Sequence, residues 1–300
     1  MDSSKPVCAT YLSRKCKDED SKMVISKRAR FHAKYYQQNF SMPDSIIFYV
    51  AKNPKTAELY LKMVKTCKYF FVKNPIIIIP NLFTYGGKWS NGPVTLNFTK
   101  YNCKYWITDE ICASAPGLVN RIIFSPIIPK LHRCDAKSLS LSHQIISYHD
   151  LSFIISSAER IRFNNVVVKH ADGSDVPLED IVAIAVKVYE ISDTKPTIAQ
   201  KTMKELSKLS HFLKLDDFTL DNVSEAFDIN AFYSYMKKNR HTKFYISFFP
   251  QPSDAFKNRL ETIVDEILET KRFNYKPPVI YFTGLDFEKY RKLCQIYHSH

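Results

Sequence analysis

Glycine is scarce in this 300-residue sequence, which holds six glycines beside 15 prolines. Loops that cradle a phosphate group need glycine, and the sequence contains no P-loop, no GxGxxG pattern and no GxSxG pattern. Hydrophobic residues make up 45% of the chain and charged residues 24%, which is close to the globular average. The composition therefore excludes collagen-like and disordered chains and predicts a folded protein with a full core.

Long apolar runs and paired cysteines are missing as well. Purely apolar runs such as Ile76–Pro80 are short, whereas a helix that crosses a bilayer needs about 20 residues. The N-terminus lacks the apolar segment of a secretory signal. The seven cysteines are scattered, and they form neither a CxxC pair nor a zinc-site spacing with histidine. We therefore expect an intracellular protein, cytoplasmic or nuclear, with no membrane segment, no metal and no cofactor.

Basic residues are in excess, and the excess lies near the N-terminus. The chain has 43 Lys and Arg against 30 Asp and Glu, a net charge of +13. Residues 1–75 hold 15 basic and 6 acidic side chains, a net charge of +9, while residues 76–130 add +3 and residues 131–300 add +1. This asymmetry favours an acidic partner, either a protein or a nucleic acid. A solubilising basic face without a dedicated partner explains the count equally well.

The candidate catalytic and metal-binding residues have simpler structural explanations. The stretch Asp172-Gly173-Ser174-Asp175 lacks the later ligands of a calcium loop, which favours a turn followed by a helix cap. The carboxylate pairs at 109–110 and 216–217 lie beside expected turns and helix ends, and His298 and His300 stand at the end of the chain. Because no catalytic constellation remains, we predict that the chain is not an enzyme.

The N-terminal quarter is predicted to contain an arm and a helical module. Residues 1–39 are polar and lack sustained periodicity, so they are predicted to form a flexible basic arm. Apolar residues then recur at helical spacing over Pro43–Lys52 and over Thr56–Phe71. An Asn-Pro pair follows each of these two segments and ends the pattern. Residues 40–75 are therefore predicted to be a module of two helices.

Residues 76–130 are predicted to be a connecting module. Ile76–Ile79 has the composition of a buried strand, and Val94–Phe98 alternates between apolar and polar residues as a strand does. Trp106–Thr108 and Ile122–Phe124 are further short apolar runs. Glycine and asparagine between these runs predict turns.

A repeating pattern begins at residue 131. Strand candidates recur at intervals of 22 to 34 residues, and a helical pattern follows each of them. The strand candidates are Ser138–Leu141, Arg160–Phe163, Val186–Ile191, Phe218–Leu220, Phe244–Phe248 and Val279–Phe282. The helical patterns are His149–Ser156, Leu178–Ala185, Pro196–Leu213, Val223–Lys238, Ser253–Glu269 and Asp286–Tyr297.

The repetition predicts an α/β fold and leaves two architectures open. One is an irregular solenoid of strand–helix units over residues 131–300, similar to leucine-rich repeats, and the other is a compact α/β sheet of ordinary topology. Repetition in register favours the solenoid. The sequence lacks the continuous asparagine ladder of regular leucine-rich repeats, although Asn follows a strand candidate at 164–165 and again at 222.

The helical module resembles an F-box. Met42-Pro43 stands where that motif opens with Leu-Pro, and apolar Ile46, Ile47 and Val50 follow at the expected offsets. Cys67-Lys68-Tyr69-Phe70 takes the place of the closing apolar-Cys-Lys-x-aromatic signature. The chain as a whole is similar to the expanded F-box-like families of nematodes.

The resemblance implies a non-catalytic substrate receptor of an SCF-type, cullin-RING ubiquitin ligase. The module of residues 40–75 is then expected to bind a Skp-type adaptor, and the repeats are expected to bind the target protein. The adaptor-binding residues that the resemblance implies are Met42, Pro43, Ile46, Ile47, Val50, Leu61, Met63, Val64, Cys67 and Phe70. The alternative is a nucleic-acid-binding protein that uses the basic residues of the arm at 14–34. This alternative ranks lower, because a charged arm that contacts phosphates does not by itself distinguish one nucleic-acid sequence from another.

Overall fold

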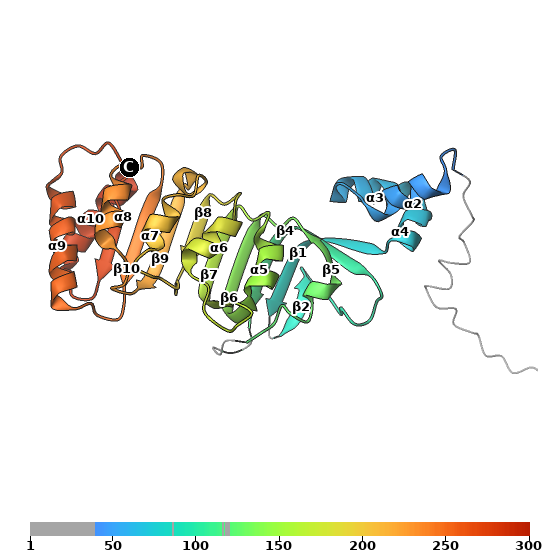
Figure 1. Ribbon diagram of the computed structural model, residues 1–300, viewed down its shortest axis with the longest axis horizontal. Coiled ribbons are helices and arrows are strands. Elements are labelled where there is room, and N and C mark those ends of the chain that lie inside the picture. Colours follow the sequence, from blue (N-terminus) through green and yellow to red (C-terminus); the bar gives the residue numbers. More distant parts are fainter. Residues whose placement is uncertain (1–39, 86, 116, 118–120) are drawn as a thin grey trace, which may run out of the picture. The chain divides into compact units, whose positions relative to one another are not determined.

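The computed structural model describes residues 40–85, 87–115, 117 and 121–300 (Figure 1). The predicted flexible arm of residues 1–39, with its basic stretch at 14–34, lies outside the described residues. Residues 45–300 form one compact unit. None of the helices in the described part of the chain combines the length and the apolar character that crossing a bilayer requires.

Within the described residues the chain forms nine α-helices and eleven strands, so the predicted α/β class is confirmed. The strands are β1 (Ile76–Tyr85), β2 (Lys88–Asn91), β3 (Val94–Thr95), β4 (Lys104–Ser114), β5 (Leu131–Cys134), β6 (Ser138–Ser147), β7 (Arg160–Lys169), β8 (Glu190–Asp193), β9 (Asp217–Val223), β10 (Lys243–Phe248) and β11 (Val279–Phe282). The helices are α2 (Asp44–Lys52), α3 (Ala57–Thr66), α4 (Lys68–Lys73), α5 (Tyr148–Ile155), α6 (Leu178–Ile184), α7 (Thr202–Leu206), α8 (Ile229–Met236), α9 (Asp254–Glu269) and α10 (Phe287–Ser299). Two short 3-10 helices lie at Ile128–Lys130 and Phe212–Lys214.

All described strands belong to one large, mostly parallel sheet. Its order is β11-β10-β9-β8-β7-β6-β4-β1-β2-β3, and β5 pairs with the first part of β4. The strands from β1 and β4 to β11 pair in parallel, whereas β2 and β3 extend the sheet as an antiparallel hairpin. From β7 to β11 each strand lies beside the strand that precedes it in the sequence, whereas β4 pairs with β1 and β6 pairs with β4.

The sheet begins at Ile76, whereas the sequence predicted the strand–helix repeat from residue 131. β1 and β4 are long and pair in parallel over most of their length, so residues 76–114 belong to the same sheet as the later strands. A hairpin and a loop connect β1 to β4 in place of a helix, and this is why the repeat pattern does not reach them. The apolar run Ile122–Phe124 is not a strand, although Phe124 is buried.

Several predicted elements are shorter or divided in the structure. The helix predicted over Thr56–Phe71 is two helices, because the backbone of Cys67 is extended and caps both α3 and α4. The pattern over Pro196–Leu213 gives α7 and, after a turn, the 3-10 helix that starts at Phe212. The helix predicted from Val223 starts only at α8, because Val223 closes β9 and the Asp228 carboxylate caps the helix. β8 begins at Glu190 and not at the predicted Val186.

The core lies between the sheet and the helices that connect its strands. Figure 1 shows α5 and α6 in front of the strands they follow. Buried side chains in register form rows across the sheet, and the sequence alternation predicts them. One row consists of Ile111, Leu139, Ile161, Ile191, Phe218 and Phe244, and the next consists of Ala113, Leu141, Phe163, Asp193, Leu220, Ile246 and Ile280. A single carboxyl group, that of Asp193, interrupts the second row.

Polar side chains connect neighbouring strands where the strands bend. His143, Asn165 and Asn222 have φ values of 52°, 52° and 54°, in the left-handed region that asparagine tolerates better than most residues. The Asn165 amide nitrogen lies 3.3 Å from His143 Nδ1, and its backbone N–H donates to Thr194 Oγ1 at 2.9 Å. The Asn222 amide donates to the Thr194 carbonyl at 2.7 Å. These four residues, here called the polar ladder, therefore join β6 to β9.

Candidate functional site

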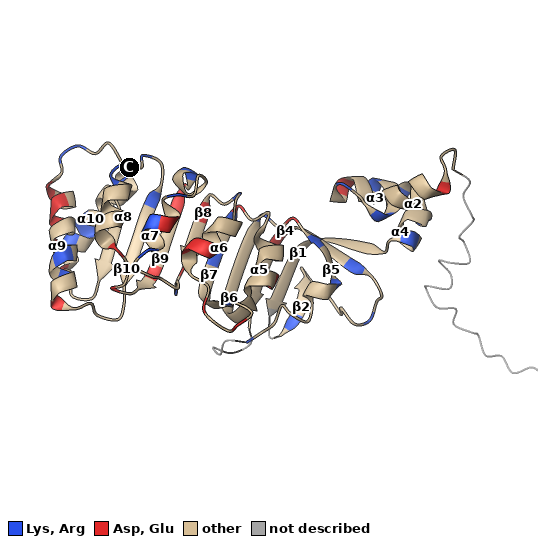
Figure 2. Ribbon diagram, in the orientation of Figure 1, with Lys and Arg blue, Asp and Glu red and all other residues tan. Residues whose placement is uncertain are grey.

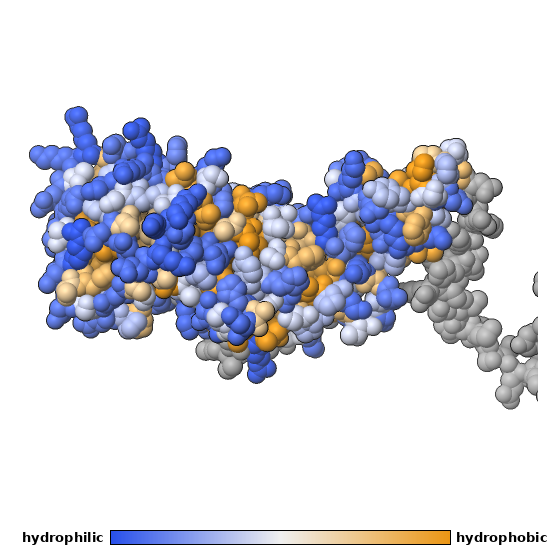
Figure 3. All heavy atoms as spheres, viewed as in Figure 1, coloured by the Kyte–Doolittle hydropathy of each residue, from blue (hydrophilic) through white to orange (hydrophobic). Residues whose placement is uncertain are grey.

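Exposed apolar side chains gather on the helices that precede the sheet. Large apolar residues that are more than a third exposed occur in both α2 and α3, and they are Ile46, Phe48, Tyr49, Val50, Leu59 and Leu61. Figure 3 shows apolar surface in the region of α2. Single exposed apolar residues are normal in folded proteins, but a cluster of six within 16 residues is typical of a binding surface. We call this cluster the apolar helix surface.

The structure divides the ten residues that the F-box resemblance implied into three groups. Met42, Pro43, Ile46, Val50 and Leu61 are exposed, and Met63 and Val64 are half-buried. Ile47, Cys67 and Phe70 are buried, with 3%, 9% and 9% of their surface exposed. In this conformation these three side chains are not available to a partner. The expectation that all ten contact an adaptor stays a prediction, and Ile47, Cys67 and Phe70 offer little exposed surface for such a contact.

Phe48, Tyr49 and Leu59 belong to the apolar helix surface, and sequence reasoning missed them. The residues at 46–50 are all apolar, so whichever side of α2 packs against the chain, the opposite side leaves apolar groups exposed. This continuous apolar run is the feature of the sequence that indicates exposed apolar residues on α2. The F-box resemblance implies only residues at the offsets of the motif, and these offsets do not include Phe48, Tyr49 or Leu59.

Lysines lie on the same helices as the apolar helix surface. Residues 40–75 contain six lysines and two acidic residues, a net charge of +4, and Figure 2 shows blue segments on α3 and α4. Glu58 pairs with Lys62 at 2.7 Å, and Lys52 lies over the Phe48 ring at 5.6 Å from its centre. The surface therefore combines apolar contact area with positive charges on the same helices, which suits an acidic partner with apolar pockets.

Tyr60 attaches α3 to the first strand of the sheet. Its side chain is 1% exposed and packs with Ile76 and Trp106. Its hydroxyl donates to the Asn74 carbonyl at 2.6 Å and accepts the Ile76 backbone N–H at 3.1 Å. Burial raises the pKa of this phenol. The hydroxyl thus satisfies two backbone groups at the point where the helices end and β1 begins.

The Tyr60→Phe variant tests this attachment. It removes both hydrogen bonds and leaves the buried Ile76 N–H without a partner, so we expect a loss of about 1 to 3 kcal/mol in the free energy of unfolding. Chemical denaturation measures the loss. Tyr49→Phe removes an equivalent hydroxyl from a side chain that is 68% exposed, and it should change the stability by less than about 0.5 kcal/mol. Equal effects of the two variants would contradict the assigned role of Tyr60.

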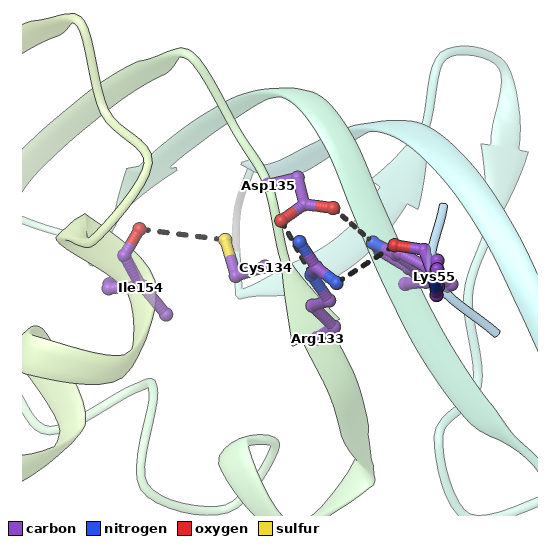
Figure 4. Close-up of polar contacts among 6 residues, drawn as sticks. Lys55, Arg133, Cys134, Asp135 and Ile154 are labelled. Atoms are coloured by element: carbon purple, nitrogen blue, oxygen red, sulfur yellow. Dashed lines mark hydrogen bonds and ion pairs between the residues drawn. The ribbon is translucent and has the colours of Figure 1, made fainter. Parts of the chain in front are cut away.

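Arg133 forms a second connection between the helices and the sheet. Its Nε donates to Asp135 Oδ1 at 2.8 Å, and its Nη1 donates to the carbonyl of Lys55, just before α3, at 3.2 Å. Figure 4 shows Arg133 between these two groups, whereas Cys134 points away toward Ile154. The guanidinium also lies over the ring of Trp106, whose indole N–H donates to Asp135 Oδ2 at 2.8 Å. The contacts hold the start of α3 against β4 and β5.

The face of the sheet opposite the core is the second candidate surface. In β6, in β8 and directly after β8 it presents small hydroxyl side chains, namely Ser138, Ser140, Ser142, Ser192 and Thr194. The exposed Arg160 and Arg162 project from β7 between them, and Arg162 donates to Glu190 Oε1 through Nη2 at 2.7 Å and through Nε at 3.2 Å. The Glu190 carboxylate raises the pKa of Arg162. This polar face therefore presents small hydroxyl side chains together with charges of both signs.

The C-terminal helix α10 contacts this same face at the end of the sheet. Tyr297 lies 3.5 Å from Asp217 Oδ2, and Lys243 lies over the Tyr297 ring. Burial and the Asp217 carboxylate raise the pKa of Tyr297 to about 12. Tyr290 makes an edge-to-face contact with Tyr281 of β11. The helix therefore covers β9 to β11 and leaves the polar face open over β6 to β8.

The residues considered for catalysis or metal binding have structural roles in the described part of the chain. Asp172 Oδ1 accepts the Ser174 N–H and hydroxyl at 2.9 and 2.6 Å, which confirms the predicted turn. Asp175 does not cap a helix as predicted but pairs with Lys169 at 2.6 Å. No group of three or more metal-ligating side chains occurs among the residues that the structure describes.

The sequence matches no model of a protein family, and a search of curated proteins also returns no match.

Proposed function

We propose that this protein is a non-catalytic substrate receptor of an SCF-type ubiquitin ligase. In this proposal the helices α2 to α4 act as an F-box-like module that binds a Skp-type adaptor, and the polar face of the sheet binds the target protein. The single observation that carries the proposal is the apolar helix surface with the lysines on the same helices. Exposed apolar area of this kind is stabilised by docking onto a partner.

The attachment of the helices to the sheet supports this division of roles. A receptor must hold its adaptor-binding part and its target-binding part together, and Tyr60 and Arg133 provide contacts of this kind within residues 45–300. Of the implied adaptor-binding residues, the exposed Ile46, Val50 and Leu61 belong to the apolar helix surface. The buried Ile47 stays outside this proposed contact.

The strand order supports a solenoid related to leucine-rich repeats. Each unit of such a solenoid stacks its strand on the strand of the preceding unit, and here the strands from β6 to β11 follow one another in this way. The polar ladder of His143, Asn165, Thr194 and Asn222 occupies successive strands, as the asparagine ladder of leucine-rich repeats does. Stacked repeats present an extended surface of strands, which suits recognition of a protein target.

Adaptor binding is tested with the double variant Ile46→Asp, Leu61→Asp. Both side chains are exposed, 47% and 41%, so the variant should fold while placing two carboxylates on the apolar helix surface. Co-purification with a Skp-type adaptor should fall at least tenfold, because central apolar contacts contribute about 1 to 2 kcal/mol each to binding. Circular dichroism verifies the fold of the variant.

A matched control places the same charges elsewhere. Val94 and Val186 are each 59% exposed and lie outside α2 to α4, so Val94→Asp, Val186→Asp should retain the adaptor. Full recovery of the adaptor by the Ile46→Asp, Leu61→Asp variant would reject the proposed mode of binding. A loss in both double variants would show that the effect is not specific to the helices.

A further inference from the structure

A cavity of about 700 Å³ lies at the carboxyl ends of the last parallel strands, away from both surfaces considered above. Three consecutive connections form it, those that follow β8, β9 and β10. Cavities of 300 to 1,000 Å³ are typical of small-ligand sites. The size of this cavity therefore fits a binding site.

Apolar side chains line part of the cavity. Phe227 and Ile229 are 1% and 3% exposed and belong to the core beneath it. The apolar surface open to a ligand comes from the half-buried Phe256 of α9 and from the exposed Ala226 and Ala255. A ligand can therefore cover this apolar surface with an apolar body.

The charged groups that line the cavity differ in the hydrogen bonds and ion pairs that they form. The Glu225 carboxylate accepts the backbone N–H and the hydroxyl of Ser253, and Asp228 Oδ1 accepts two backbone N–H groups of α8. Arg259 donates through Nε to Asn230 Oδ1 at 2.6 Å, and it has no ion pair among the described residues. Its guanidinium is therefore a charged group of the lining that can still form a paired bond with a carboxylate.

From these features we propose that the cavity binds a ligand in which a carboxylate is attached to an apolar body. The apolar body rests on Phe256, Ala226 and Ala255, and the carboxylate pairs with Arg259. The Asn230 contact holds the guanidinium at the rim in the required position. Such chemistry occurs in small carboxylic acids and in protein segments where an apolar residue precedes Glu or Asp. The site goes beyond the proposed receptor function, since it shares no residue with the apolar helix surface or the polar face.

The test uses the full-length protein and three matched probes, which are 4-phenylbutyrate, 4-phenylbutanol and 4-phenylbutylamine. NMR titration should show 4-phenylbutyrate shifting the amide signals of residues 226–230 and 253–259. The alcohol should bind at least fivefold more weakly and the amine more weakly still. An amine that binds as tightly as the acid, or shifts confined to other residues, would overturn the proposal.

Variants assign the two halves of the site. Arg259→Gln should weaken binding of the acid at least fivefold and leave binding of the alcohol unchanged, while Arg272→Gln, an exposed control in the loop after α9, should change neither. Ala255→Trp should block both probes by filling the cavity. Unchanged binding of the acid in Arg259→Gln would reject the role of the guanidinium.

The peptide acetyl-Gly-Phe-Glu-Gly-amide distinguishes the two possible sources of the ligand. Tighter binding of this peptide than of 4-phenylbutyrate indicates a protein segment, and weaker binding indicates a small acid.

Discussion

Replacing Trp106 with alanine is expected to lower the free energy of unfolding by about 3 to 5 kcal/mol. The side chain is fully buried and packs with Tyr60 and Ile76 where the helices meet the sheet. Its loss leaves a cavity, and it also removes the indole donor of Asp135 and the ring beneath Arg133. Urea denaturation, followed by circular dichroism, measures the effect.

The Trp106→Phe variant separates packing from hydrogen bonding. Phenylalanine keeps an aromatic ring in the site but removes the N–H group that donates to Asp135. We expect it to recover more than half of the stability lost in the alanine variant, since one hydrogen bond contributes about 1 to 2 kcal/mol. A loss below 1 kcal/mol in Trp106→Ala would show that this contact does not hold the helices to the sheet.

The Asp193→Asn variant is expected to be more stable than the wild-type protein above pH 7. Asp193 is 3% exposed and lies in a core row between Phe163 and Leu220. Burial raises the pKa of its carboxyl group from 3.8 to about 7, and the nearby Asp221 adds to the effect, while the N–H of Lys195 opposes it. This increase in pKa corresponds to about 4 kcal/mol, the upper limit of the expected gain.

The direction of the pH dependence follows from the raised pKa. Between pH 4 and pH 7 the folded protein retains the proton on Asp193 while the unfolded chain loses it, so the stability of the wild type should fall as the pH rises. Asparagine cannot ionise, so the variant should match the wild type near pH 4 and exceed it at pH 8. Denaturation curves from pH 4 to pH 8 measure this difference. A difference that does not change with pH would contradict the assignment.

An exposed carboxylate provides the control for this series. The pKa of Asp172 is lowered by hydrogen bonds from Ser174, in contrast to that of Asp193. Asp172→Asn should therefore leave the pH dependence above pH 5 unchanged. A variant that alters the slope there as much as Asp193→Asn does would point to an effect of net charge.

The strands and helices with strong periodicity could be predicted from the sequence. β11 has the predicted bounds, and α9 begins one residue after its predicted start because Ser253 is its cap. The alternation Leu139, Leu141 and Ile161, Phe163 predicts which side chains enter the core, because side chains of a strand point to opposite faces in turn. Local spacing was sufficient for these elements, because each carries its own apolar pattern and no residue interrupts its backbone geometry.

Long-range pairing could not be predicted in the same way. The parallel pairing of β1 with β4 joins segments separated by a hairpin, and no local spacing signals it. The division between α3 and α4 depends on the extended backbone of Cys67, a residue without a strong preference for ending a helix. The cavity beside Arg259 combines residues from three separate connections, so its existence requires the folded chain.

The strand order has a consequence for the kinetics of folding. Because the strands from β6 to β11 pair with their sequence neighbours, most contacts of the sheet form between segments only a few dozen residues apart. Closing such short loops costs little entropy, so a pair of adjacent units can nucleate and the sheet can then grow from either side. β1 and β4 pair Ile76 with Lys104 across a connection of similar length, so the same argument extends to them.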